Sequence, residues 1–156
     1  MTFTPPAEPA EHLVERESSA WNELISLAER LTPDEAALPG YYPDTGWSVK
    51  DALAHIGGWL AEAGLMLYRI MGGTYVPDDV DIEAMNERFF ETMRTVEYEI
   101  IRTQCWASRA RMLQVLSELP ERGPDALWWI RKAGPDHYHE HLPRLRAWVQ
   151  ELQAGA

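Results

Sequence analysis

Three histidines have the residue type and spacing of a metal site. His137 and His141 lie four positions apart in a segment with helical periodicity, which places their imidazoles one turn apart on one helix face. His55 lies in a second helical segment. A third imidazole from a neighbouring helix would complete a set of nitrogen ligands for a divalent ion such as Zn²⁺ or Ni²⁺ and leave positions open for water or substrate. The alternative is that these histidines are structural or surface residues.

Such a centre could support two kinds of reaction. Zinc held by three neutral imidazoles keeps its positive charge and lowers the pKa of a bound water toward ~7, which would favour hydrolysis. It could equally stabilise a thiolate for S-transfer or thiol-assisted isomerisation. Asp51 and Glu62 are the candidate general bases, at one turn and about two turns from His55 on the same helix. Both could instead be capping or solvated residues.

A second group of residues is predicted to build a pocket near this site. The candidate walls are Trp47, Trp59, Phe89 and Tyr138, although each could be part of the core. Asn86 could supply a polar contact to a ligand. Cys105, the single cysteine, is expected to be buried late in a helix and to have no nucleophilic role.

The apolar periodicity predicts an all-α fold, a four-helix bundle. No segment alternates apolar and polar residues as a strand does. A flexible lead-in over residues 1–10 is expected to precede a single domain over residues 11–156. The expected helices are 11–31, 48–71, one long helix from 77–81 to 119, and 135–153, separated by a long loop over 33–47 and a connector over 120–134.

Composition excludes several classes of partner. The chain has 156 residues, 46% of them hydrophobic, and a net charge of -11. Binding to nucleic acids or to anionic membranes requires a basic protein face, which an acidic chain lacks. One cysteine cannot form an intrachain disulfide, which fits a reducing cytoplasm. The N-terminus does not read as a signal peptide, and no apolar run approaches the ~20 residues of a transmembrane helix.

Two short motifs resemble the DinB-like superfamily, which includes mycothiol-dependent maleylpyruvate isomerases, bacillithiol transferases and ClbS-like proteins. They are the Trp-Ser opening of residues 46–59, with His55 seven positions after Ser48, and the late His137-x-x-x-His141 pair in residues 136–148. The resemblance implies an up-down-down-up bundle, commonly dimeric, with a divalent metal on His55, His137 and His141. Trp106, Trp128 and Trp129 offer independent support for a homodimer, since aromatic patches mark interfaces.

The leading hypothesis is a metal-dependent enzyme, a hydrolase or thiol S-transferase acting on a small electrophilic or toxic metabolite. A low-molecular-weight thiol would be its second cofactor. The alternative is a non-enzymatic or metal-independent small-molecule-binding or self-protection protein, because the His-Leu-Pro-Arg sequence from His141 resembles the ClbS-like branch. A third reading is a dimerising relative whose histidines only pack or form hydrogen bonds.

Overall fold

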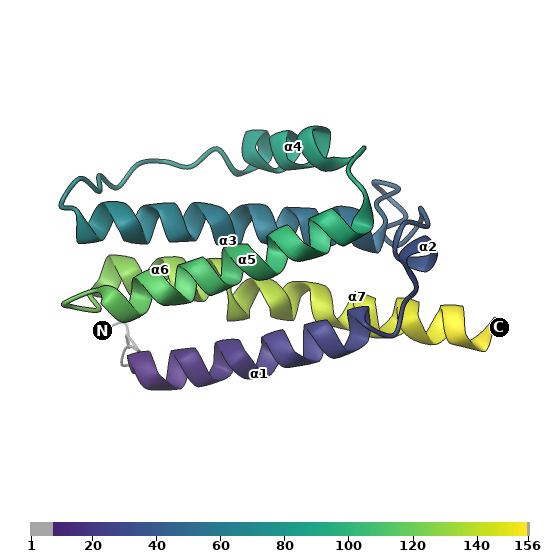
Figure 1. The fold of residues 1–156 in the computed structure, drawn as a ribbon, viewed down its shortest axis with the longest axis horizontal. Helices are drawn as coiled ribbons and strands as arrows, with labels where there is room; N and C mark the ends of the chain where they lie inside the picture. Colours follow the sequence, from purple (N-terminus) through teal and green to yellow (C-terminus); the bar gives the residue numbers. More distant parts are fainter. Residues whose placement is uncertain (1–7, 156) are drawn as a thin grey trace, which may run out of the picture.

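Four long helices lie side by side and form a bundle (Figure 1). The computed structural model describes residues 8–155, so most of the predicted lead-in lies outside the described residues. Within them there is no strand, only an isolated bridge between Tyr42 and Trp47. The helices are α1 (Ala10–Ala28), α2 (Pro33–Ala36), α3 (Val49–Met71), α4 (Ile82–Met93), α5 (Tyr98–Glu118), α6 (Pro124–Ala133) and α7 (Pro135–Ala154).

The bundle has the predicted up-down-down-up order. α1 and α7 run in one direction, whereas α3 and α5 run in the other (Figure 1). α3 packs most extensively against α5, and α1 packs against α7. Because α3 and α5 are parallel neighbours, the chain between them must travel back along the bundle. It does so as an outer segment, residues 72–97, which contains α4 and lies over α3.

A capping box fixes the start of α3. The Ser48 side chain accepts a hydrogen bond from the main-chain N–H of Asp51, and the Asp51 carboxylate accepts one from the main-chain N–H of Ser48. This arrangement satisfies two donors that the first helical turn leaves free. It places the start of α3 about two turns before His55, and it occupies the carboxylate of Asp51.

The single long third helix predicted up to residue 119 is wrong, because the chain breaks it between α4 and α5. Residues 94–97 form a turn there, since the outer segment has to enter the bundle in the opposite direction. The ammonium group of Lys50 on α3 donates to the carbonyls of Arg94 and Val96, at 2.9 and 3.1 Å. These bonds satisfy carbonyl groups that a continuous helix would have used internally.

Two segments predicted as irregular also contain helices. The loop over 33–47 begins with α2, whose Thr32 and Glu35 form a second capping box. The connector over 120–134 contains α6, which begins at Pro124 and leaves Gly134 alone between α6 and α7. A Cβ at Gly134 would lie 2.7 Å from the carbonyl oxygen of Ile130, so this tight junction requires glycine. The junction sets where α7 begins.

Glycines allow α3 to lie close to its neighbours. A Cβ on Gly57 would lie 3.1 Å from Cα of Cys105 on α5. At Gly58 the ring of Phe89 from α4 occupies the space that a Cβ would fill.

Among residues 8–155, no helix is both long and apolar enough to cross a bilayer.

Candidate metal centre

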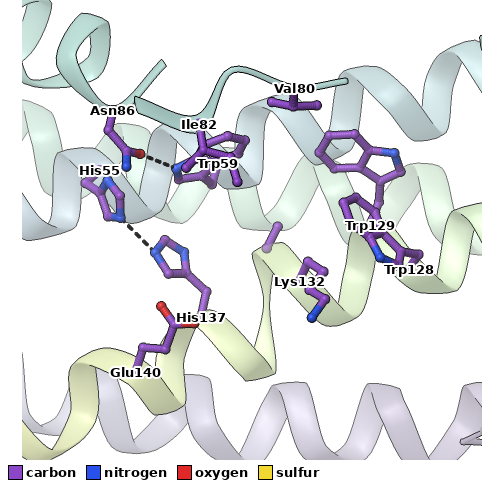
Figure 2. A pocket seen from close by; sticks show the side chains of 11 residues that line it. His55, Trp59, Val80, Ile82, Asn86, Trp128, Trp129, Lys132, His137 and Glu140 are labelled. Carbon is purple, nitrogen blue, oxygen red and sulfur yellow. Dashed lines mark hydrogen bonds between the residues drawn. The ribbon is translucent and has the colours of Figure 1, made fainter. Parts of the chain in front are cut away.

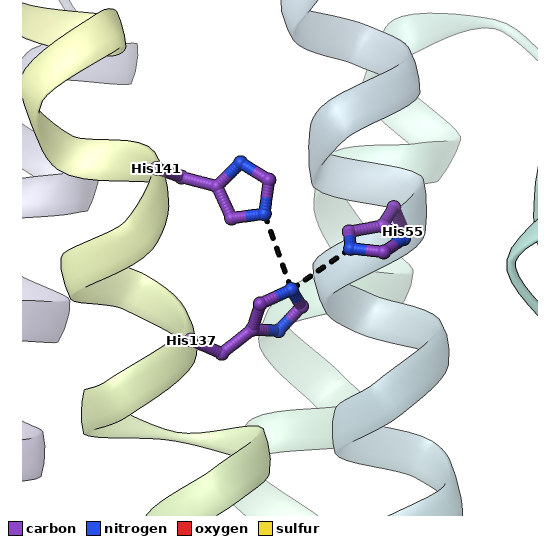
Figure 3. Close-up of side chains that lie close together, drawn as sticks. All are labelled: His55, His137 and His141. Atoms are coloured by element: carbon purple, nitrogen blue, oxygen red, sulfur yellow. Dashed lines mark hydrogen bonds between the residues drawn. The ribbon is translucent and has the colours of Figure 1, made fainter. Parts of the chain in front are cut away.

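The three histidines singled out by the sequence converge in the interior of the bundle. His55 projects from the second turn of α3, and His137 and His141 project from the first two turns of α7 (Figure 3). The Nε2 atom of His137 lies 2.8 Å from Nε2 of His55 and 3.1 Å from Nε2 of His141. All three side chains are buried, and their ligand atoms lie within 4.8 Å of one another.

This geometry fits a cation better than it fits a hydrogen-bonded cluster. Nε2 of a neutral imidazole carries either one proton or one lone pair. His137 Nε2 can therefore form a linear N–H···N bond with only one of its two close neighbours. Three nitrogens about 2.05 Å from a common ion would lie about 2.9–3.3 Å apart for angles between 90° and 109°. Of the two separations from His137 Nε2, 3.1 Å lies inside that range and 2.8 Å lies just below it.

Burial keeps these imidazoles neutral, as metal ligands must be. Burial, with the neighbouring His141 as a smaller cause, lowers the pKa of His55 to about 4. Burial alone lowers the pKa of His141 to about 4. The pKa of His137 is well below its ordinary value, first because of burial and then because of His141 and His55. Protonation of any of them would place a positive charge beside the other two.

The three rings differ in what their second nitrogen contacts. Nδ1 of His141 lies 2.6 Å from the hydroxyl of Tyr42 in the loop before α3. The Nδ1 atoms of His55 and His137 are buried without a hydrogen-bond partner. Metal-bound histidines normally use this nitrogen for a contact that fixes the ring. The sequence analysis missed Tyr42, which lies in a non-periodic segment rich in proline and glycine.

A cavity of about 380 Å³ opens beside His55 and His137 (Figure 2). Trp59 of α3 and Asn86 of α4, both named as pocket candidates, line it, and the Trp59 indole N–H donates to the Asn86 amide oxygen at 2.8 Å. The farther wall is apolar. It is formed by Val80, Ile82, Trp128, Trp129 and Ala133, with Lys132 at the edge.

Trp47 and Tyr138 do not line this cavity. The Trp47 indole stacks on Phe90 of α4 with its ring centroid 5.3 Å from that of His55, so it supports the histidine from the side. Tyr138 was expected near the pocket, but it is fully buried in the core, and its hydroxyl donates to Glu17 of α1 at 3.0 Å. A step of one residue rotates a helical side chain by about 100°, which turns Tyr138 away from the face of His137.

The carboxylate that reaches the cavity is Glu140, not either predicted base. Asp51 caps α3, and Glu62 is half-buried about two turns beyond His55, outside the cavity lining. Glu140 lies on the exposed side of α7 and lines the cavity with His55 and His137 (Figure 2). The sequence interpretation placed Glu140 off the face of the histidine pair, which was wrong: residues three apart on a helix are neighbours, and Glu140 follows His137 by three.

The remaining residues considered in the sequence have structural surroundings. Cys105 is buried, and burial raises the pKa of its thiol to about 12, which agrees with the absence of a nucleophilic role. Trp129 is buried and donates its indole N–H to Tyr75. Trp106 is half-buried and packs against Trp21. Of the three tryptophans taken as support for a dimer, Trp128 is the exposed one, and the homodimer stays a prediction.

Comparison with known proteins identifies the family. No curated protein matches the chain. A solved structure, that of an uncharacterised protein from Escherichia coli UTI89, has the same fold, with a TM-score of 0.77 over 92% of this chain and 94% of that one, at 15% sequence identity. The family model for the mycothiol maleylpyruvate isomerase N-terminal domain matches residues 18–153. The chain therefore belongs to this DinB-like family.

Proposed function

We propose that this protein is a metal-dependent enzyme in which His55, His137 and His141 hold a divalent ion, Zn²⁺ or Ni²⁺. The observation that carries the proposal is the meeting of three buried Nε2 atoms beside a cavity. Three neutral nitrogen donors match the preference of these ions. His55 and His137 line the cavity, so a ligand there would reach the side of the centre that is not enclosed by protein.

The reaction that these surroundings support best is transfer of a low-molecular-weight thiol to a small electrophile. A divalent ion, when bound, would supply positive charge that favours a thiolate over a thiol. Glu140 is placed to accept the S–H proton, since it lines the cavity beside His137. The thiol sulfur then forms a bond to the electrophilic carbon, and the proton passes from Glu140 to the leaving group or to the carbon that gains the electron pair.

The family to which the chain belongs supports a thiol as one substrate. The matching family is named for a mycothiol-dependent isomerase, and mycothiol is a thiol. The buried Cys105 cannot serve as the thiol itself, because it lies on α5 and packs against Gly57. Hydrolysis is the second reaction that the same residues could perform, with water in place of the thiol and Glu140 accepting its proton.

The cavity also supports a second candidate function, binding of a small molecule without metal. Its far wall carries two indoles, Trp128 and Trp129, and the side chains of Val80 and Ile82. An apolar wall with a few polar groups is typical of a ligand site. A binding protein of this kind would hold its ligand equally well in the presence of a strong chelator, whereas the proposed enzyme would lose activity.

The deciding experiment is metal analysis of protein purified without a histidine tag. We expect about one Zn²⁺ or Ni²⁺ per chain, lost in His141→Ala and retained in a His139→Ala control, since His139 is exposed on the same helix. Circular dichroism must show that both variants keep their helical content. A wild-type protein that stays free of metal after reconstitution would overturn the metalloenzyme and favour the binding protein.

A further inference from the structure

We propose that Tyr42 is a positioning residue of the metal centre, whose hydroxyl holds His141 in the tautomer and orientation that direct Nε2 toward the cation. The inference rests on the proposed metal-binding function. Tyr42 does not line the cavity, and its direct contact with the three histidines is the one with His141.

The first support is the contact itself. The Tyr42 hydroxyl and Nδ1 of His141 lie 2.6 Å apart, which is the distance of a strong hydrogen bond. No side chain plays this part for the other two ligand candidates: Nδ1 of His55 and Nδ1 of His137 are buried without a partner, and the polar group that acts on His137 is the main chain of Ala133. Tyr42 is therefore the residue whose side chain contacts the outer nitrogen of one of the three rings.

The second support comes from which ring nitrogen of His141 carries the proton. A cation at the meeting point needs the Nε2 lone pair of His141, so its ring proton must sit on Nδ1. In that tautomer Nδ1–H donates to the Tyr42 oxygen. A hydroxyl can act as acceptor as well as donor, so the same contact survives when the proton moves to Nε2 in the metal-free protein. Phenylalanine would leave the Nδ1–H buried without an acceptor, which is costly.

The third support is the rigid local structure that presents Tyr42. Its main-chain N–H donates to the Trp47 carbonyl at 3.1 Å, and its carbonyl accepts from Gly46 at 2.8 Å. Gly46 has a φ of 74°, a conformation that favours glycine. The neighbouring Tyr41 hydroxyl contacts the His141 carbonyl at 3.4 Å. The loop thus contacts His141 at both its ring and its main chain.

The test compares the Zn²⁺ affinity of Tyr42→Phe and Tyr75→Phe in the full chain by competition with a chromogenic chelator. Tyr42→Phe keeps the aromatic ring, which lies edge-on to His141, and removes only the hydroxyl. Tyr75→Phe is the matched control, because it removes the hydroxyl of another half-buried tyrosine, one that accepts from Trp129. We expect Tyr42→Phe to weaken Zn²⁺ binding about tenfold, and the control to bind as the wild type does.

A nitrogen NMR measurement separates positioning from loss of stability. In zinc-loaded wild type we expect His141 to be protonated on Nδ1 and coordinated through Nε2. In Tyr42→Phe the Nδ1–H resonance of His141 should move upfield, while those of His55 and His137 stay. The wild-type measurement remains decisive if the variant does not fold, since coordination of His141 through Nδ1 would overturn the proposal.

The outcomes distinguish this inference from the function on which it rests. Equal Zn²⁺ affinity of Tyr42→Phe and wild type overturns the role of Tyr42 and leaves the metal centre intact. An equal loss of affinity in Tyr42→Phe and Tyr75→Phe also overturns it, because the effect would then be one of general stability. Failure of the wild type to bind Zn²⁺ overturns both the positioning role and the metal centre.

Discussion

Mild acid is expected to destabilise the metal-free protein through its buried histidines. Burial lowers the pKa of His55 and of His141 to about 4 in the folded state, against 6.5 as the ordinary value. Below pH 6.5 these two histidines therefore bind protons in the unfolded chain, whereas in the folded chain they stay neutral until the pH approaches 4. Stability contributed by these residues is complete above pH 6.5 and is lost progressively as the pH falls toward 4.

The size of this loss follows from the two pKa values. Linkage for a histidine with a pKa of 6.5 unfolded and about 4 folded gives a loss of ~2 kcal/mol between pH 7 and pH 5. His55 and His141 would together lose ~4 kcal/mol if they titrated independently. Because the charge of one disfavours the charge of the other, the second proton binds at still lower pH in the folded state. His137 contributes in the same direction.

Urea unfolding in the presence of a chelator, at pH 7 and pH 5, measures this effect. Acidic residues also titrate toward pH 5, so the wild type must be compared with His55→Leu, which removes one buried imidazole, and with His139→Leu, which removes an exposed one. The wild type and His139→Leu should lose ~2 kcal/mol more than His55→Leu, about 1 M in urea midpoint. An identical loss in all three proteins would refute the reasoning, because the buried ring would then not be the acid-sensitive group.

Two further predictions concern carboxylates: Glu140 on the cavity side of α7, and Glu17 of α1, which contacts Tyr138 of α7. Glu140→Gln should keep the metal content of the wild type. It should lower the rate of conjugation of 1-chloro-2,4-dinitrobenzene with a small thiol at least tenfold, and the pH profile of that rate should lose its acidic limb. An unchanged rate would exclude Glu140 as the base. Glu17→Gln should lower the free energy of unfolding by ~3 kcal/mol, because Glu17 is fully buried and accepts from Arg109 at 2.7 and 2.9 Å and from Tyr138 at 3.0 Å. Urea unfolding checks this value, and a loss below ~1 kcal/mol would show that the buried charge on Glu17 contributes little to stability.

The sequence predicted the helices whose apolar stripes face the common core. α1, α3 and α7 begin and end within a few residues of their expected positions. The single long third helix, expected from 77–81 to 119, was wrong because apolar periodicity continues across a turn when both flanking helices have an apolar face. The turn at 94–97 is fixed by a tertiary contact from Lys50, and no local signal in the sequence reports it.

The sequence predicted the site residues whose positions are set by helical spacing, but not the one whose position is set by a loop. The spacing of His137 and His141 gave their common face, and the third ligand candidate lay on another helix with its own capping box. Tyr138 was misplaced because adjacency in sequence was taken for adjacency in space. Tyr42 was missed because a loop with positive φ at Gly40 and Gly46 has no period from which its side-chain directions could be read.

The position of the histidines in the bundle links metal binding to the closure of the fold. α3 packs mainly against α5, and α7 packs mainly against α1, whereas α3 and α7 make few direct contacts. His55 belongs to the first pair of helices, and His137 and His141 belong to the second. An ion bound by all three would join the two pairs through α3 and α7, which make few other direct contacts. The free energy of metal binding would therefore also stabilise the bundle, and the same three residues would serve both the proposed reaction and the fold.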